Sequence, residues 1–149
     1  MPILRCVGCG HVQESSLLDP VCERCSSAVV LADSQRVRVE AERFEEIPLG
    51  VWRYSLLLPV VSAGTRVTLG EGGTPLLPAR RLGAELGLEN LLLKDESRNP
   101  TGSFIDRGAT VLVSLAKSRG VKECTCVTTG NLGASLAAYC AKAGIAARV

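Results

Sequence analysis

The chain has 149 residues, of which 46% are hydrophobic and 21% charged, and its formal net charge is +2. This length and composition predict one folded domain, or a small module with most of a larger one, and argue against a disordered chain. The low net charge and the 3% aromatic content argue against a dedicated nucleic-acid-binding protein. The longest apolar run, Leu56–Val61, is too short to cross a membrane, and the first residues lack a secretory signal, so we expect a cytoplasmic protein without a membrane partner.

Two Cys-x2-Cys pairs, Cys6 with Cys9 and Cys22 with Cys25, stand near the start of the chain. Each pair places two thiolates on one tight turn, and two pairs spaced by about a dozen residues can bind Zn²⁺ in a tetrahedral site. We predict a structural zinc site in a zinc-ribbon-like module, residues 1–33. His11 is not needed as a ligand because four cysteines fill the coordination shell. Two disulfides or free thiols are the alternative, which a cytoplasmic location disfavours.

Residues 34–73 are predicted to be a linker followed by a hydrophobic anchor. The stretch 32–47 is highly charged, and Trp52, Tyr54 and Leu56–Leu58 are expected to pack onto the next domain. The sequence GEGG at Gly70–Gly73 lacks the Lys-Ser/Thr that follows a phosphate-binding loop, so we interpret it as a flexible loop.

Residues 74–149 alternate between strand and helix patterns and form the third predicted segment. Strands are predicted at 74–79, 89–96, 123–130 and 145–149, and helices at 80–87, 104–120 and 131–144. This order predicts an α/β fold with a parallel sheet of βαβ units. The sequence ends inside a strand that should be central, so we expect an incomplete sheet: either the sequence is truncated or a second chain completes the sheet.

Two loops follow predicted strands and lead directly into predicted helices. The first is NPTGSF, Asn99–Phe104, and the second is Thr128–Asn131. Ligands of open α/β sheets bind at the carboxyl ends of the strands, and unpaired N–H groups at a helix start favour a carboxylate or a phosphate. Asn131 can cap its helix or donate a hydrogen bond to a ligand.

The longest motif-rich stretches are LGEGGTPLLPARRLGAELGLENLLLKDESRNPTGSFIDRG, residues 69–108, and TTGNLGASLAAYCAKAGI, residues 128–145. Both resemble the threonine synthase branch of the fold-type-II pyridoxal-phosphate enzymes. The motifs E-G-G-T-P-L, L-K-D-E, N-P-T-G-S-F-x-D-R-G and T-G-N occur in the order of that family, and the resemblance covers nearly the whole chain. It implies a pyridoxal 5'-phosphate cofactor, an amino-acid substrate, and the conversion of O-phosphohomoserine and water to threonine and phosphate.

The resemblance also assigns residues, and one of them departs from the family. The x of S-F-x-D-R-G is the family's cofactor-binding lysine, and Ile105 occupies that position. An alkyl side chain offers neither a nucleophilic amine nor a proton. By position, Asn131 would bind the ring hydroxyl of the cofactor, and Thr129 and Gly130 the substrate carboxylate. Leu132 stands where the family often has Ser or Thr, which removes one carboxylate contact.

Ile105 also has a structural interpretation. It is the first of four small or apolar residues spaced along one helix face, with Ala109, Leu112 and Ala116, so it can simply pack. Lys94 is not expected to replace the missing amine because it matches the lysine of the family's L-K-D-E motif. Cys124 and Cys126 are expected to be core thiols of a buried strand.

We therefore expect an inactive amino-terminal fragment or paralogue of a threonine synthase, with pyridoxal phosphate binding weakened or lost. One alternative is a non-catalytic partner or one half of a split pyridoxal-phosphate enzyme. Another is a zinc-ribbon binding module, which the few basic residues in the ribbon segment disfavour. A neighbouring family of the same fold, threonine dehydratase-like or cysteate synthase-like, stays open as well.

Overall fold

The computed structural model describes residues 3–14, 21–31, 40, 42–45, 47–59 and 61–149. The chain divides into two compact units, Met1–Ala41 and Glu42–Val149, and each is described by itself. No helix in the described residues has the length and apolar character that crossing a membrane requires.

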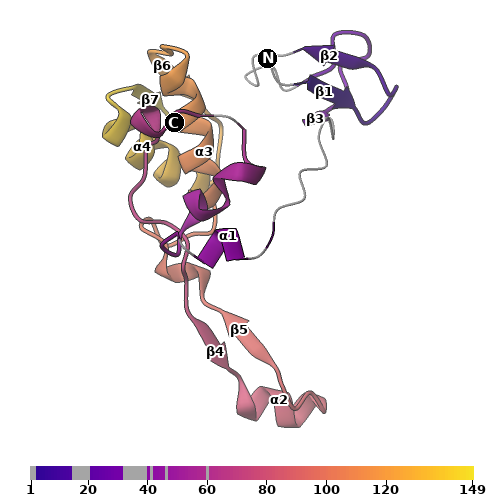
Figure 1. Cartoon of the computed structure of the whole chain (residues 1–149), viewed down its shortest axis with the longest axis vertical. Helices are drawn as coiled ribbons and strands as arrows, with labels where there is room; N and C mark the ends of the chain where they lie inside the picture. Colours follow the sequence, from indigo (N-terminus) through magenta and orange to yellow (C-terminus); the bar gives the residue numbers. More distant parts are fainter. Residues whose placement is uncertain (1–2, 15–20, 32–39, 41, 46, 60) are drawn as a thin grey trace. The chain divides into compact units, whose positions relative to one another are not determined.

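The first unit is built on a three-stranded antiparallel sheet in the order β2-β1-β3 (Figure 1). Its strands are β1 (Ile3–Cys6), β2 (Val12–Glu14) and β3 (Val29–Leu31). Side chains alternate between the faces of a strand, and Leu4 and Cys6 of β1 are buried while Arg5 between them is exposed. The buried face of β1 therefore brings the Cys6 thiol to the interior of this unit.

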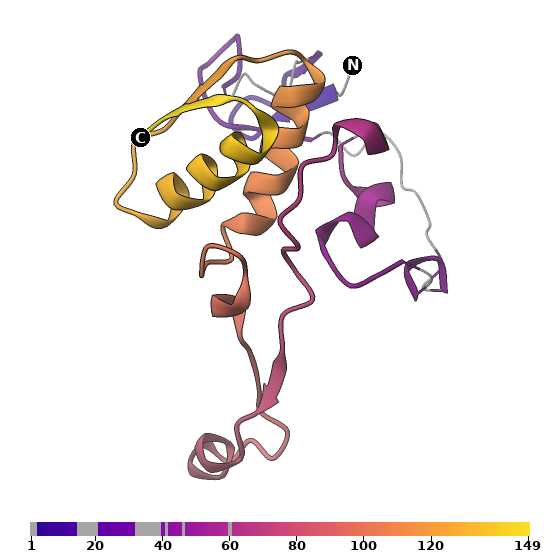
Figure 2. The same ribbon diagram turned by 90° about the vertical axis from the view of Figure 1, so that its left-hand side faces the viewer.

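Two long helices form the core of the second unit. They are α3 (Asp106–Ser118) and α4 (Asn131–Ala143), which lie side by side in Figure 2. Val113 of α3 and Tyr139 and Cys140 of α4 are fully buried between them and their neighbours. The strands β6 (Glu123–Thr125) and β7 (Ala146–Arg148) are parallel and are joined through α4, which makes one β–α–β unit.

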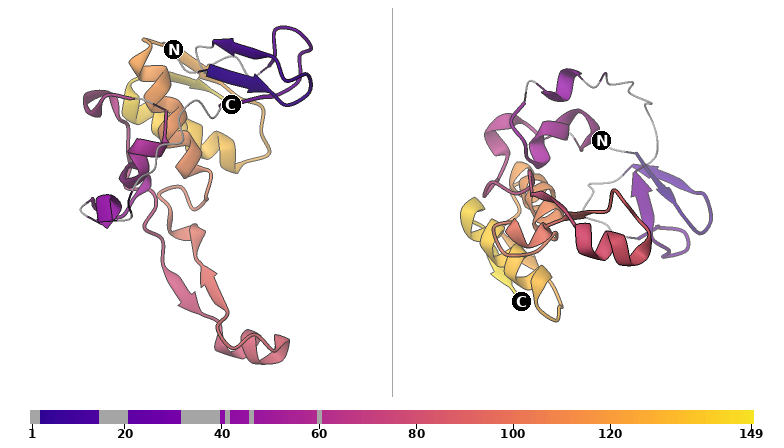
Figure 3. Two further views of the ribbon diagram at one scale, coloured as in Figure 1. Left: turned by 45° about the vertical axis from the view of Figure 1, so that its right-hand side comes forward. Right: turned by 90° about the horizontal axis from the view of Figure 1, so that it is seen from below.

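The other two strands of this unit do not form the predicted parallel pair. β4 (Leu76–Pro78) and β5 (Leu92–Lys94) are antiparallel, with Leu77 opposite Leu93. The helix between them, α2 (Arg80–Leu86), lies at the end of the pair, far from α3 and α4 (Figures 1 and 3). A parallel crossover needs a helix that packs back on the sheet, and this seven-residue helix turns the chain instead. In the part of the chain that the structure describes, the expected parallel βαβ pairing is thus found only at β6–β7.

The second unit also contains short helices: α1 (Glu42–Glu45), η1 (Val51–Leu57), η2 (Ala63–Thr65) and η3 (Glu96–Arg98). In η1 the Trp52 indole donates a 3.0 Å hydrogen bond to Thr110 Oγ1 of α3, so Trp52 anchors this segment as predicted. Leu56 and Leu57 were expected to pack in the same way, but they are about half exposed, at 47% and 57%.

Glu71 is buried, which the sequence did not predict for a loop residue of the GEGG stretch. Its carboxylate is 1% exposed and accepts hydrogen bonds from the Tyr139 hydroxyl at 2.8 Å, the Thr68 hydroxyl at 3.0 Å and the Leu69 N–H at 2.9 Å. Burying a carboxylate is costly unless its oxygens are hydrogen-bonded. These contacts fix the loop against α4.

We predict that Tyr139→Phe destabilises the second unit, because it removes the one α4 donor to the buried Glu71 carboxylate, which keeps only donors from its own loop among the described residues. The expected loss in unfolding free energy is about 1–3 kcal/mol. Denaturant unfolding monitored through Trp52, the chain's one tryptophan, measures it. Tyr54→Phe is the matched control, since Tyr54 is 44% exposed. Equal stability of the two variants would contradict the prediction.

Candidate functional site

The starts of α3 and α4 lie beside one pocket. We use the term helix-start site for these two helix starts and the loops that precede them, Asn99–Ile105 and Thr128–Gly130. The pocket has a volume of about 420 Å³. Its lining is mostly apolar: Phe104, Ile105, Arg107, Gly108, Ala109, Leu112, Leu132 and Leu136. The pocket thus lies between the start of α3, with the end of the loop before it, and Leu132 and Leu136 of α4; Thr128–Asn131 do not line it.

Asp106 holds the helix-start site together. Its side chain is 0% exposed and accepts three hydrogen bonds, from the Thr101 N–H at 2.7 Å, the Thr101 hydroxyl at 2.6 Å and the Ser135 hydroxyl at 2.5 Å. Asp106 is also in the first turn of α3, where the helix dipole favours a negative charge. One carboxylate thus joins the loop before α3 to the second turn of α4.

A second carboxylate, that of Glu96, joins α3 to Thr74 in the segment before β4. The Arg107 guanidinium donates to both Glu96 oxygens, at 2.7 and 2.8 Å, and the Thr74 hydroxyl donates to Glu96 at 2.6 Å. These contacts lower the pKa of Glu96 to about 2. The Arg107 guanidinium makes the largest contribution to this shift, and the Thr74 hydroxyl makes the next largest. The bidentate pair connects Glu96 of the L-K-D-E motif to Arg107 of the D-R-G motif. It therefore fixes the geometry of the loops that carry these motifs.

Asn99 connects the GEGG loop to the NPTG loop. Its amide oxygen accepts from the Gly72 N–H at 3.0 Å, while its NH₂ group donates to the backbone oxygen of Glu96 at 2.8 Å. Gly72 has a φ of 87°, and a Cβ there would lie 3.0 Å from the backbone of Gly50 and Val51. Only glycine combines this conformation with this close approach.

Ile105 is half-buried at the start of α3 and lines the pocket. Its backbone carbonyl accepts from the Ala109 N–H at 2.9 Å, an ordinary helical bond, and its side chain offers only carbon to the pocket. Lys94 does not line the pocket, and its Nζ donates to the Thr74 carbonyl at 2.6 Å from strand β5. The residues at this position therefore do not fit a covalently attached aldehyde cofactor.

The second loop of the helix-start site, Thr128–Gly130, is largely exposed to solvent. Thr129, Gly130 and Asn131 are exposed, and Asn131 is the first residue of α4. The Gly130 N–H is already used, since it donates to the Thr128 hydroxyl at 3.1 Å. No hydrogen bond found in the described part of the chain uses the Asn131 side chain. The predicted roles of these three residues in binding cofactor and substrate stay predictions.

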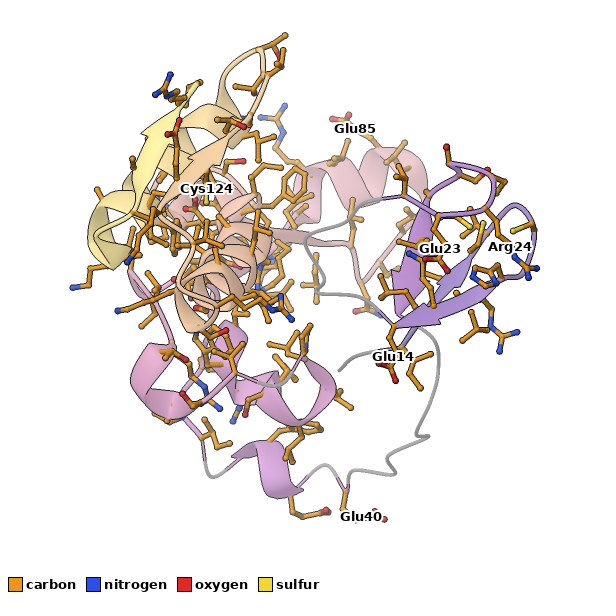
Figure 4. All side chains as sticks on the ribbon, turned by 90° about the horizontal axis from the view of Figure 1, so that it is seen from above. Glu14, Glu23, Arg24, Glu40, Glu85 and Cys124 are labelled. Carbon is orange, nitrogen blue, oxygen red and sulfur yellow. The ribbon has the colours of Figure 1, made fainter. Side chains whose placement is uncertain are left out.

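The four cysteines of the first unit come together as the sequence predicted. Their sulfur atoms all lie within 4.8 Å of one another, with 3.4 Å between Cys6 and Cys25 and 3.8 Å between Cys9 and Cys22. A tetrahedral zinc with Zn–S bonds of 2.3 Å requires sulfur atoms about 3.8 Å apart. All seven cysteines of the chain are free thiols, so the disulfide alternative is not found. His11 instead pairs with Glu23, at 2.8 Å, a residue labelled in Figure 4.

Backbone N–H groups surround these sulfurs. The amides of Gly8 and Cys9 point at the Cys6 sulfur, at 3.3 and 3.4 Å, and the N–H of Cys9 lowers the pKa of the Cys6 thiol. The hydroxyl and backbone of Ser27 lower the pKa of Cys25 to about 6. These contacts favour the thiolate, the form that binds a metal, at Cys6 and Cys25. At Cys9, instead, the N–H of His11 acts to lower the pKa, but the neighbouring thiol of Cys25 and desolvation together outweigh it and raise this pKa to about 11.

Comparison with known proteins identifies the larger unit. Residues 67–149 match the family described as pyridoxal-phosphate-dependent enzymes. The chain belongs to this family. It is 42% identical over 142 residues to the threonine synthase of Methanocaldococcus jannaschii, covering 94% of this chain and 35% of that protein.

Two further relatives extend this comparison. The threonine synthase of Methanosarcina acetivorans is 40% identical, over 95% of this chain and 35% of that protein. That of Mycobacterium leprae is 52% identical, over 62% of this chain and 25% of that protein. The chain thus spans about a third or less of the length of these relatives.

The sequence patterns did not predict the structural roles of three residues: Glu71, Ser135 and Tyr139. Each is buried and hydrogen-bonded to a partner distant in sequence. Ser135 and Tyr139 are spaced four residues apart on α4 and therefore share one face of it, the buried one. That spacing of polar residues within an otherwise apolar helix was the available signal.

We predict that Glu96→Gln lowers the unfolding free energy of the second unit by roughly 1–3 kcal/mol at neutral pH. Because the pKa of Glu96 falls from 4.5 to about 2 in the folded state, the stabilisation is complete above pH 4.5 and is lost as the pH falls toward 2. Unfolding followed through Trp52 across this range measures the effect. Glu89→Gln, at an exposed position, is the control, and a pH-independent difference between Glu96→Gln and wild type would contradict the account.

Proposed function

We propose that this chain is a threonine synthase-like polypeptide that carries the scaffold of the family's cofactor site but does not turn over substrate on its own. The family reaction converts O-phosphohomoserine and water to threonine and phosphate. In the family, the cofactor supplies an electron-withdrawing ring that stabilises carbanions during this chemistry. Support comes from the family membership, the threonine synthase relatives and the intact hydrogen-bonding of the helix-start site.

Ile105 is the observation that carries the proposal. Its position in S-F-x-D-R-G corresponds by resemblance to the family's lysine, and its carbon side chain lines the pocket where that amine would be. Asn131 is proposed to face the ring hydroxyl of a non-covalently held cofactor, and Thr129 and Gly130 the carboxylate of an amino acid, with weak binding because no covalent link forms.

A second candidate is one half of a split enzyme, or a partner of another family chain. Leu76 and Leu77 are consecutive residues of β4 and therefore point to opposite faces of the β4–β5 pair. They are 56% and 47% exposed, and their neighbours Leu92 and Leu93 on β5 are similarly exposed. A two-stranded ribbon is marginal by itself, and strands with leucine on both faces are usually buried on both faces. Further polypeptide, in this chain or a second one, would cover them.

The first unit is proposed to be a zinc-ribbon-like module with one structural Zn²⁺. The four cysteine sulfurs fit a closed tetrahedral shell, which leaves no open position for a substrate. We also propose the segment boundaries 1–33, 34–73 and 74–149 and a cytoplasmic location.

The proposed loss of cofactor attachment is tested by reduction with borohydride. After incubation with pyridoxal phosphate, the wild-type chain is expected to show no lysine modified in preference to the others, as mapped by mass spectrometry. The same chain joined to the remainder of the Methanosarcina acetivorans threonine synthase should gain one selective adduct with Ile105→Lys. Ile105→Met is the matched control without an amine. A selective adduct in the wild-type chain would overturn the proposal.

For the zinc site, we predict about one equivalent of zinc in the purified chain by elemental mass spectrometry, given the closed four-sulfur shell. Cys9→Ser should lose most of this zinc, since three sulfurs leave the shell open. Cys126→Ser, a cysteine of the other unit, should retain it. Retention of a full equivalent by Cys9→Ser, or none in the wild type, would show that these sulfurs do not form a zinc site.

A further inference from the structure

The four-cysteine cluster of the first unit contains two thiol–thiol contacts that run between its two Cys-x2-Cys turns. The sulfur atoms of Cys6 and Cys25 are 3.4 Å apart, and those of Cys9 and Cys22 are 3.8 Å apart. Each cysteine takes part in one of these two hydrogen bonds. Four cysteines can form two disulfides in three ways, and the hydrogen bonds correspond to one of them.

Each of the two contacts joins an exposed cysteine to a buried one. Cys6 and Cys22 are 2% and 1% exposed, whereas Cys9 and Cys25 are exposed. A small disulfide in solution therefore reaches Cys9 or Cys25 first, and the buried partner lies beside it to complete the exchange. Pairing the two exposed cysteines with each other would leave the two buried ones as a pair that the oxidant does not reach.

The two turns also lie directly against each other. The Val7 N–H donates to the Ala28 carbonyl at 3.1 Å, and a Cβ at Gly8 would lie 2.6 Å from the Ser27 hydroxyl and 3.7 Å from the Cys25 sulfur. Glycine thus permits an approach that a side chain would obstruct. Disulfides within each turn would leave the turns unlinked without a metal, whereas disulfides between the turns would hold them together.

We propose that the cluster is a redox-responsive zinc site, in which exchange with a small disulfide such as glutathione disulfide forms the Cys6–Cys25 and Cys9–Cys22 disulfides and releases the metal. The inference rests on the zinc site proposed above. In each pair, the thiolate of the exposed cysteine attacks one sulfur of glutathione disulfide, forms a mixed disulfide and releases one glutathione thiolate. The buried thiolate then attacks the protein sulfur of the mixed disulfide and releases the second glutathione thiolate.

The exchange balances over the two pairs. The four cysteine thiolates lose four electrons in total, and two molecules of glutathione disulfide gain them and become four glutathione thiolates. A sulfur in a disulfide no longer carries the negative charge that binds Zn²⁺, so the cation passes into solution. Reduction with dithiothreitol in the presence of zinc restores the original site.

The first test measures zinc in the full, reduced chain by elemental mass spectrometry and then follows its release with a chromogenic chelator. Glutathione disulfide should release about one equivalent, as a four-sulfur shell holds one ion, and reduced glutathione should release little. Zinc that is present at the start but retained in glutathione disulfide would overturn the inference and leave the zinc site standing. Absence of zinc at the start would show that the zinc site itself is wrong, and the inference falls with it.

Peptide mapping tests the pairing. The oxidised chain is alkylated with iodoacetamide and digested without reduction. Trypsin and Glu-C cut after Glu14, Glu23 and Arg24, all labelled in Figure 4, which leaves the first turn on one peptide and separates the two cysteines of the second turn. We expect all three peptides in one linked species, with fragmentation of the first-turn peptide placing the Cys25 peptide on Cys6. A disulfide within either turn, or the two partners exchanged, would overturn the inference.

Two matched variants give an independent readout, because each removes one member of a different pair. After oxidation, Cys25→Ser should carry the Cys9–Cys22 disulfide and a free Cys6. Cys22→Ser should carry the Cys6–Cys25 disulfide and a free Cys9. Any other cysteine left free in these variants would contradict the pairing, and if a variant does not fold, the map of the wild-type chain decides.

Discussion

The buried Asp106 carboxylate is the constraint on which the second unit depends. It lies at the start of α3, and it accepts hydrogen bonds from Thr101 in the loop before that helix and from Ser135 on α4. An ionised group without contact to water is costly unless all its oxygens are satisfied. The three donors can satisfy Asp106 only when the loop and both helices are in place together. The position of the two helix starts is thereby fixed.

Two further carboxylates in the family's motifs, those of Glu71 and Glu96, are held by hydrogen bonds in the same way. Among the described residues, the Glu71 carboxylate accepts hydrogen bonds from Tyr139 and its own loop, and that of Glu96 from Arg107, Thr74 and Asn99. These carboxylates and their partners hold the loops in place, whereas the side chain of Ile105 is an alkyl group that lines the pocket and makes no hydrogen bond. This separation explains how isoleucine can stand at that position while the surrounding hydrogen bonds stay intact.

The sequence predicted what short-range patterns encode. The paired Cys-x2-Cys spacing predicted the sulfur cluster, and periodicity predicted α3 and α4 to within a few residues. It failed where long-range geometry decides. The antiparallel β4–β5 pair follows from how the short helix α2 turns the chain, and the burial of Glu71 follows from Tyr139, distant in sequence. The roles of Thr129, Gly130 and Asn131 depend on a ligand and stay predictions.

The most direct measurement is a double-mutant cycle on Asp106 and Ser135. The unfolding free energies of wild type, Asp106→Asn, Ser135→Ala and the double variant are compared through the fluorescence of Trp52. If the buried carboxylate holds α3 and α4 together, the two substitutions are coupled by roughly 1–3 kcal/mol. Additive effects, within about 0.3–0.5 kcal/mol, would show that this contact does not position the helix starts.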